Sequence, residues 1–310
     1  MKKSIKKELN REYEKYMREK NIDVILAEYG PTGVEMLDVA VRMKIPVVVH
    51  FHGFDASVYK FLKKYKNDYQ RLFAEAAAII AVSEKMRKRI VEMGADENNV
   101  FLIPCGVDVD KFVSHNRNKK DGKNLLFVGR FVEKKGPDHL IKVFSLTKKK
   151  FPDIKLNMIG DGKMIKKCKI MCRDLNLMDS VSFLGRRDHD FVAEMMAKSD
   201  IYVQHSIKAE SGDEEGTPVS VMEAMASGLP VVSTFHGGIP DVVKHKDNGY
   251  LVAEKDFVQM SKYLNELLSD KLLLKKMGER SRKLALENLS VKKRIADIDK
   301  VLNKALDENI

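Results

Sequence analysis

The sequence of 310 residues contains only three cysteines, Cys105, Cys168 and Cys172. Three cysteines cannot form a disulfide framework, which excludes the small disulfide-stabilised secreted domains and fits a reducing cytosol. Cys168 and Cys172 lie four residues apart on an expected helix, but no third or fourth ligand lies near them in the sequence. We therefore expect no metal site there.

The sequence also lacks any apolar run of the roughly 18 residues that a membrane-spanning helix needs. Its first 20 residues are charged and have no apolar centre of the kind found in a secretory signal. We expect a cytoplasmic protein that is either soluble or bound peripherally to the inner face of a membrane.

Positive charge is in excess, with 56 Lys and Arg against 45 Asp and Glu, which gives a net charge of +11. This excess favours anionic partners such as phosphates, nucleic acid or an acidic membrane surface. The basic residues are spread rather than clustered with aromatic residues, and no nucleic-acid-binding motif is present, so we expect no nucleic-acid partner. The basic stretch 60–66 either contacts anionic lipid or is one solvated helix face.

Short apolar runs rich in valine and isoleucine alternate with longer helical patterns along the whole chain. This alternation predicts an α/β, doubly wound architecture, and the continuous apolar runs are typical of parallel strands covered on both faces. The expected strands are 22–27, 46–50, 78–82, 100–103, 124–128, 155–159, 181–184, 201–203, 230–233 and 249–252. The expected helices include 59–77, 84–93, 136–150, 163–175 and 219–227.

One polar stretch, residues 115–124, has no apolar face and predicts a linker. The chain length predicts about two domains. We expect a first domain over residues 1–114, a second over 125–290, and a final amphipathic helix over 291–310.

The densest group of candidate binding residues is EGTPVSVMEAMASGLPVV, which begins at Glu215. Thr217 is the expected N-cap of a helix with Pro218 at its first position. The start of such a helix suits a phosphate, because free backbone N–H groups and the positive end of the dipole lie there. Glu215 before the helix and Glu223 in its first turns could accept hydrogen bonds from hydroxyls on either side of that phosphate. The alternative is an ordinary loop charge and helix charge.

A second group, Gly129, Arg130 and Lys135, follows the expected strand 124–128. Doubly wound sheets bind ligands at the carboxyl ends of their strands, and Gly129 permits close backbone approach there. Arg130 and Lys135 could neutralise a diphosphate. The alternative is a pair of solvated loop cations.

Weaker candidates also follow expected strands. Gly160 and Gly162 resemble part of a dinucleotide-binding fingerprint but lack its third glycine, and a tight turn explains them equally well. His52, in the segment HFHGFD, either contacts a substrate or is a hydrogen-bonded structural histidine. Because all these candidates lie at the carboxyl ends of strands, they predict one cleft.

These segments together resemble the retaining nucleotide-sugar glycosyltransferases of family 4, whose GT-B architecture has two facing Rossmann-like domains. The pair Glu215 and Glu223, with seven residues between them, carries the resemblance, and GRFVEKKG, IGDGKM, VSFLGRR and STFHGGIPDVV match in order. HGFD is similar to exopolysaccharide-type members. The resemblance runs from about residue 23 to about residue 285.

The resemblance implies glycosyl transfer with retention from a nucleotide-diphosphate sugar to a saccharide or lipid-linked acceptor, in polysaccharide or glycolipid biosynthesis. It implies that Arg130 and Lys135 contact the diphosphate, that Glu223 binds the ribose, and that Glu215 binds the transferred sugar. The backbone around Gly216, Thr217 and Pro218 then lies near the sugar and phosphate, with Gly129, Gly160 and Gly162 also on the donor side.

The resemblance further implies that Arg186 lies in the loop that contacts the base and that His52 lies near the anomeric carbon. The implied catalytic residues are His52, Arg130, Lys135 and Glu215. No metal or other cofactor is expected, because the cations stabilise the leaving diphosphate. The leaving phosphate would itself deprotonate the acceptor.

The sequence departs from this family before residue 22, where members begin with a strand, a glycine-rich turn and two further βα units. The loss of these units would expose an interior strand edge. Three readings remain open: a fragment or late start, a partner chain or homo-oligomer that covers the gap, or a short form in which the helix over residues 1–20 does so. A non-catalytic nucleotide-sugar-binding or assembly subunit is the alternative function.

Overall fold

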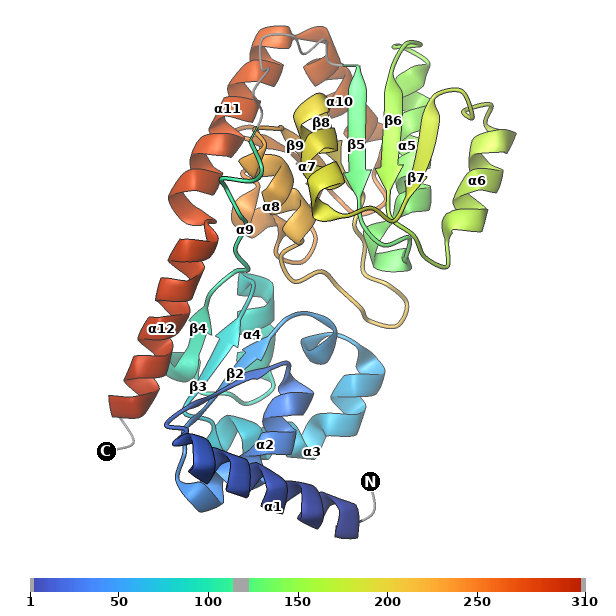
Figure 1. The fold of residues 1–310 in the computed structure, drawn as a ribbon. Helices are drawn as coiled ribbons and strands as arrows, with labels where there is room; N and C mark the ends of the chain where they lie inside the picture. The colour runs from blue at the N-terminus through green and yellow to red at the C-terminus, as the bar shows by residue number, and fades with distance from the viewer. Residues whose placement is uncertain (1–2, 114–122, 308–310) are drawn as a thin grey trace. The chain divides into compact units, whose positions relative to one another are not determined.

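The computed structural model describes residues 3–113 and 123–307 (Figure 1). Contacts group the chain into two compact units, one made of residues 1–104, 211–216 and 294–310, and the other of residues 105–210 and 217–293. Each unit is an α/β domain with a parallel sheet, which confirms the predicted fold class. The expected linker over 115–124 lies mostly outside the described residues.

The first unit contains a parallel sheet in the order β1-β2-β3-β4. Every residue of β2 and β3 is buried, as continuous apolar runs predict. The strands are β1 (Ile25–Glu28), β2 (Val47–Phe51), β3 (Ala78–Ala81) and β4 (Val100–Leu102). The helices are α1 (Lys3–Lys20), α2 (Gly30–Met43), α3 (Tyr59–Glu75), α4 (Glu84–Glu92) and α12 (Val291–Asp307), with one-turn helices η1 (Phe54–Ala56) and η2 (Glu97–Asn99).

Helix α12 joins the core of the first unit although it comes from the far end of the chain. Its residues Val301 and Ala305 pack in one apolar cluster with Val48, Ile80 and Ile103. The contact grouping thus assigns most of this helix to the first unit. The domain limits read from the sequence remain a prediction.

The second unit contains a parallel sheet in the order β10-β9-β8-β5-β6-β7. Its strands are β5 (Asn124–Val128), β6 (Lys155–Ile159), β7 (Val181–Gly185), β8 (Ile201–Val203), β9 (Val231–Thr234) and β10 (Gly249–Val252). Since β5 pairs with β6 on one side and β8 on the other, the chain order reverses beside β5. Ligands bind at such reversal points in doubly wound sheets.

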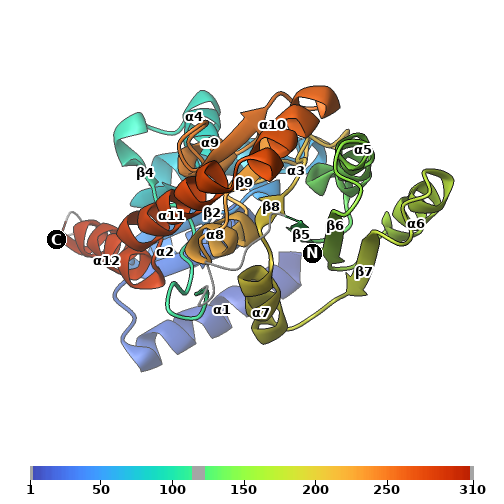
Figure 2. The same cartoon turned by 90° about the horizontal axis from the view of Figure 1, so that it is seen from above.

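Helices cover both faces of this second sheet, and each face has its own apolar core. In Figure 2, α7 and α8 lie on one face and α5 and α10 lie on the other. The helices are α5 (Pro137–Lys148), α6 (Ile165–Asp174), α7 (His189–Lys198), α8 (Val219–Ala226), α9 (Ile239–Val242), α10 (Phe257–Ser269) and α11 (Lys271–Asn288), and η4 (Glu133–Lys135) is a single turn.

All ten expected strands are present, but α8 does not start as the sequence predicts. Pro218, not Thr217, is its N-cap residue, because Pro218 has an extended ψ of 120° and the helix begins at Val219. No side chain caps this helix start. Within the described parts of the chain, no helix is both long enough and apolar enough to cross a bilayer.

Candidate functional site

A pocket of about 740 Å³ opens at the carboxyl ends of β5, β6 and β7 in the second unit. It lies beside the point where the sheet order reverses, since β5 is one of the two strands at that point, and doubly wound sheets bind ligands there. It brings together six residues predicted from the sequence: Gly129, Arg130, Gly160, Gly162, Arg186 and Glu223. The remaining lining residues are Val128, Ile159, Asp161, Arg187, His189, Val192 and Val219.

Two glycines let the backbone loops of this pocket pack directly on one another. A β-carbon at Gly160 would lie 2.0 Å from the carbonyl oxygen of Gly129, and one at Gly162 would lie 2.7 Å from that of Phe131. Both glycines also have positive φ, 131° and 153°, which side chains disfavour. The tight-turn interpretation is therefore correct for the backbone, and the same turn lines the pocket.

A buried tyrosine fixes α8 against the end of β5. The Tyr202 hydroxyl oxygen lies 3.1 Å from the Val128 carbonyl oxygen, 2.8 Å from Ser220 Oγ and 2.8 Å from Gln204 Oε1. Val128 is the last residue of β5, and Ser220 stands one turn before Glu223 on α8. This network holds the first turn of α8, and with it Glu223 one turn further along, next to the end of β5.

Glu223 is almost fully buried yet lines the pocket. His189 Nδ1 lies 3.7 Å from its Oε1. Burial raises the pKa of the Glu223 carboxyl, and the charges of His189, Lys135 and Lys111 only partly oppose this. A carboxylate in such a dry site gains most from hydroxyl donors that a ligand brings.

The two predicted cations are placed differently. Arg130 is exposed and lines the pocket. Lys135 is buried, is not among the pocket-lining residues, and runs under Gly129, where a β-carbon would lie 3.3 Å from Lys135 Cδ. Lys135 thus lies behind the pocket wall, and its charge is one of those that partly oppose the raised pKa of Glu223.

The motif that begins at Glu215 is divided between the two units. Glu215 and Gly216 group with the first unit, whereas Thr217, Pro218 and Glu223 group with the second. Thr217 is buried, and neither it nor Pro218 lines the pocket. The structure therefore places Glu223 in the pocket and leaves the sugar-binding role of Glu215 a prediction.

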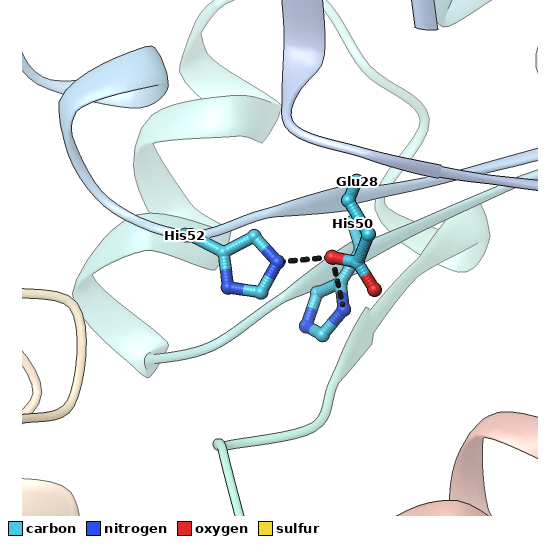
Figure 3. Close-up of side chains that lie close together, drawn as sticks. All are labelled: Glu28, His50 and His52. Carbon is cyan, nitrogen blue, oxygen red and sulfur yellow. Dashed lines mark hydrogen bonds and ion pairs between the residues drawn. The ribbon is translucent and has the colours of Figure 1, made fainter. Parts of the chain in front are cut away.

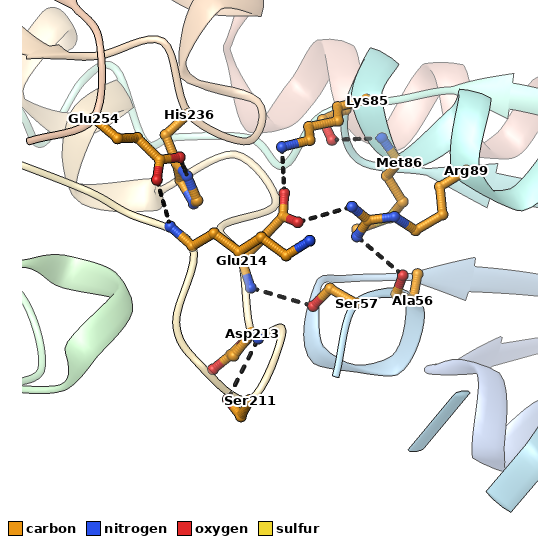
Figure 4. A network of polar contacts seen from close by, with 12 residues as sticks. Ala56, Ser57, Lys85, Met86, Arg89, Ser211, Asp213, Glu214, His236 and Glu254 are labelled. Carbon is orange, nitrogen blue, oxygen red and sulfur yellow. Dashed lines mark hydrogen bonds and ion pairs between the residues drawn. The ribbon is translucent and has the colours of Figure 1, made fainter. Parts of the chain in front are cut away.

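The residue before Glu215, which the sequence analysis passed over, is the centre of an ion-pair network (Figure 4). Glu214 forms an ion pair with Lys85 at 2.5 Å and accepts a hydrogen bond from Arg89 at 2.8 Å, and its backbone N–H donates to Ser57 Oγ at 3.2 Å. Burial raises the pKa of Glu214, but the two cations outweigh it and bring the pKa to about 2. Glu214 is a structural acid of the first unit.

His52 follows β2 directly and belongs to the first unit. The fully buried Asp55 carboxylate holds its loop by accepting hydrogen bonds from the backbone N–H groups of His52 at 3.2 Å, Gly53 at 2.8 Å and Gly30 at 3.1 Å. The Tyr69 hydroxyl donates to the Asp55 carbonyl at 3.0 Å. This explains the aspartate of the HGFD segment.

Two further side chains lie beside His52, as Figure 3 shows. The Glu28 carboxylate contacts His52 Nε2 and lies 3.3 Å from His50 Nδ1. Burial first, and the neighbouring His52 second, lower the pKa of His50 to about 4 despite the opposing Glu28 charge. His50 is therefore neutral near pH 7. Neither Glu28 nor His50 is among the site residues predicted from the sequence, because their contact depends on the register of β1 against β2.

Comparisons with known proteins place the chain in a family. A model of the glycosyl transferases group 1 matches residues 108–284, more than half of the chain, and a model of glycosyltransferase family 4 matches residues 5–111. The chain belongs to the group 1 glycosyltransferases. The first match contains every pocket residue named above, and the second contains His52 and Glu28.

Curated glycosyltransferases resemble this chain over most of its length. It is 32% identical over 241 residues to the amylovoran biosynthesis glycosyltransferase AmsK of Erwinia amylovora, and the matched residues make up 76% of this chain and 58% of AmsK. It is 32% identical over 250 residues to the putative colanic acid biosynthesis glycosyltransferase WcaL of Salmonella typhimurium, 79% of this chain and 61% of WcaL. The chain thus spans about three fifths of the length of these curated relatives.

Solved structures confirm the GT-B-like fold of this group 1 glycosyltransferase. The crystal structure of Anabaena HepE in complex with UDP has a TM-score of 0.84 at 20% identity, covering 95% of this chain and 82% of HepE. A sucrose-phosphate synthase of Thermosynechococcus elongatus has a TM-score of 0.81 at 17% identity, covering 96% of this chain and 77% of that protein. At these identities the likeness concerns the fold.

Proposed function

We propose that this chain transfers a sugar from a nucleotide-diphosphate sugar to a saccharide or lipid-linked acceptor during polysaccharide or glycolipid biosynthesis. The observation that carries the proposal is the pocket at the reversal point of the second sheet, which combines exposed arginines with the buried carboxylate of Glu223. Cations suit a diphosphate, and a dry carboxylate suits ribose hydroxyls. AmsK and WcaL, named for the biosynthesis of two polysaccharides, support this acceptor class.

The proposal assigns a role to each predicted residue. Arg130, which lines the pocket, and the charge of Lys135 behind Gly129 offset the diphosphate, and Arg186, which also lines the pocket, contacts the base. In the proposal, the transferred sugar is bound by Glu215 and by the backbone at Gly216, Thr217 and Pro218, and His52 lies near the reacting carbon. Retention of configuration, acceptor deprotonation by the leaving phosphate, independence from a metal at the diphosphate, and a cytoplasmic location are further parts of the proposal.

In this proposal, the site catalyses transfer by stabilising the negative charge that develops on the leaving diphosphate. Guanidinium groups fixed before the reaction stabilise that charge without reorganising during bond cleavage. Arg187 and His189, which the sequence analysis did not select, add cationic or donor groups to the same pocket. The sequence indicates them only through the segment GRRDHDF, in which Asp188 is the N-cap residue of α7 and His189 is the first residue of that helix.

Nucleotide binding tests the donor half. Calorimetric titration with UDP, GDP, ADP and the matching monophosphates should identify one diphosphate that binds most tightly. Arg130→Ala should weaken diphosphate binding by about 1.5–3 kcal/mol and monophosphate binding by less, because a charged hydrogen bond to the second phosphate is lost. The control is Arg173→Ala, an exposed arginine at the end of α6.

Turnover tests the enzyme half. Release of the diphosphate from a sugar nucleotide, and the anomeric configuration of the transferred sugar by NMR, would establish transfer and retention. Binding without any turnover would instead support a nucleotide-sugar-binding subunit. Equal weakening of diphosphate and monophosphate by Arg130→Ala would remove Arg130 from the diphosphate site.

A further inference from the structure

Three side chains of the first unit with metal-binding atoms converge at the carboxyl ends of β1 and β2 (Figure 3). They are Glu28, His50 and His52, and one ligand atom from each lies within 4.8 Å of the others. None of the three lines the pocket of the second unit. The donor pocket therefore does not account for this cluster, and the proposed function uses only His52 of the three.

Strand geometry explains the convergence. Glu28 and His50 are register partners on neighbouring parallel strands. His50 and His52 are two residues apart, so their side chains leave the same face, and their ring centroids lie 4.1 Å apart. The Asp55 carboxylate holds the backbone of His52 in place by accepting a hydrogen bond from its N–H group. The arrangement is thus set by the fold and not by one flexible side chain.

His50 gives the independent sign of a ligand. It is 5% exposed, and neither ring nitrogen makes a hydrogen bond among the described residues. Its Nδ1 has the Glu28 carboxylate oxygen 3.3 Å away, without hydrogen-bond geometry. Buried polar atoms are normally satisfied, so a buried imidazole aimed at a carboxylate and a second imidazole indicates a missing partner.

We propose that Glu28, His50 and His52 bind one divalent transition-metal ion of the zinc class. Two imidazoles and one carboxylate suit zinc, whereas magnesium and calcium prefer oxygen ligands only. Zinc–nitrogen bonds of about 2.0–2.1 Å put neighbouring tetrahedral ligand atoms roughly 3.3 Å apart. The His50 Nδ1–Glu28 Oε2 distance of 3.3 Å has this value.

Without an ion, His52 Nε2 and the Glu28 carboxylate are hydrogen-bonded to each other, and bonds from both side chains to the ion would replace that hydrogen bond. The Glu28 side chain is 50% exposed and that of His52 is 23% exposed, so an ion could enter from solvent. Three protein ligands leave a fourth position for water or an anionic oxygen. The proposal does not depend on the donor site proposed above.

The test is metal binding by the full chain after treatment with a chelator and in the presence of a reductant. Titration with Zn²⁺ by calorimetry should show one site, and Co²⁺ should give the visible absorption bands of a four-coordinate ion, which Zn²⁺ then removes. Mg²⁺ should not compete. Glu28→Gln and His52→Ala should each lower the Zn²⁺ affinity by at least tenfold.

Two controls separate this cluster from other ligands. His189→Ala removes an exposed histidine of the second unit, and Cys105→Ser removes the only cysteine that is not buried; both should leave Zn²⁺ affinity unchanged. Because His50 is buried, the Zn²⁺ affinity of His50→Ala is compared with that of the parent chain only if the two circular dichroism spectra match. Absence of a stoichiometric Zn²⁺ site, or unchanged affinity in both Glu28→Gln and His52→Ala, would overturn the proposal and leave Glu28 as a hydrogen-bond partner of His52.

Discussion

Gly216 lies directly against the backbone carbonyl of His52, so that a β-carbon on Gly216 would stand 2.5 Å from that oxygen. Both residues belong to the first unit. The loop at the start of the EGTP motif therefore packs on the loop that carries His52. Because φ of Gly216 is not in the left-handed region, the need for glycine here comes from space and not from backbone conformation.

Gly216→Ala should lower the free energy of unfolding by about 1–3 kcal/mol, because the added methyl group overpacks the His52 carbonyl and Val82. Urea denaturation at pH 7 measures this change. Ser211→Ala, on the same loop, is the control and should change stability by less than about 0.5 kcal/mol. An alanine variant as stable as the parent would mean that the two loops do not pack in solution as they do here.

Glu214→Gln should destabilise the first unit by about 1–3 kcal/mol at pH 7, because Lys85 and Arg89 lose a buried charged acceptor. The folded pKa of about 2 lies below the ordinary value of 4.5. The stability that this group contributes is therefore complete above pH 4.5 and disappears as the pH falls toward 2. Urea denaturation of both proteins should show a difference in unfolding free energy that is constant from pH 7 to about pH 4.5 and narrows from there down to pH 3. A difference that stays constant down to pH 3 would contradict the depressed pKa of Glu214.

The sequence predicts the sheets well because their signal is local. Residues 124–128, 155–159, 201–203 and 249–252 form strands with the expected bounds, since each is an apolar run that ends at polar or turn-forming residues. The expected strand over 22–27 starts later, at Ile25. The N–H of Ile22 instead donates to the Met17 carbonyl at 3.1 Å, which extends the end of α1, and pairing with β2 begins only at Ile25.

The site is less predictable because it depends on register and on how side chains turn. Arg130, Arg186 and Glu223 could be found from their positions after strands and on α8. Lys135 also follows β5, but the one-turn helix Glu133–Lys135 directs it under Gly129. Glu28 carries no motif in the sequence, because only the alignment of β1 with β2 brings it to His50 and His52. His50 lies two residues before His52, but its contact with Glu28 depends on the same alignment.

Asp55→Asn should lower the free energy of unfolding by about 1–3 kcal/mol, because an amide has one acceptor oxygen where the carboxylate serves three backbone N–H groups. The matched control is Asp68→Asn on the exposed face of α3, which should have little effect. Thermal unfolding measures both variants. If Asp55→Asn proved as stable as the parent, Asp55 would not be the residue that holds the His52 loop.

Glu223→Gln should separate stability from binding. The raised pKa means that the folded chain disfavours the charged carboxylate, so the charge lowers stability once the pH is above the folded pKa. Below pH 4.5 the parent loses this disadvantage, because Glu223 is neutral in both folded and unfolded chains. The amide variant should therefore melt at a higher temperature than the parent at pH 7, and the difference should vanish on acidification.

The same variant should bind the preferred nucleoside diphosphate about tenfold more weakly, because the ribose hydroxyls lose a charged acceptor. Calorimetry at pH 7 measures this loss, and Glu279→Gln on the exposed side of α11 is the control for both measurements. A higher melting temperature with unchanged nucleotide affinity would support the burial of the Glu223 charge but contradict its role in binding the ribose. A lower melting temperature would show that the carboxylate has stabilising partners in the folded chain, contrary to the raised pKa.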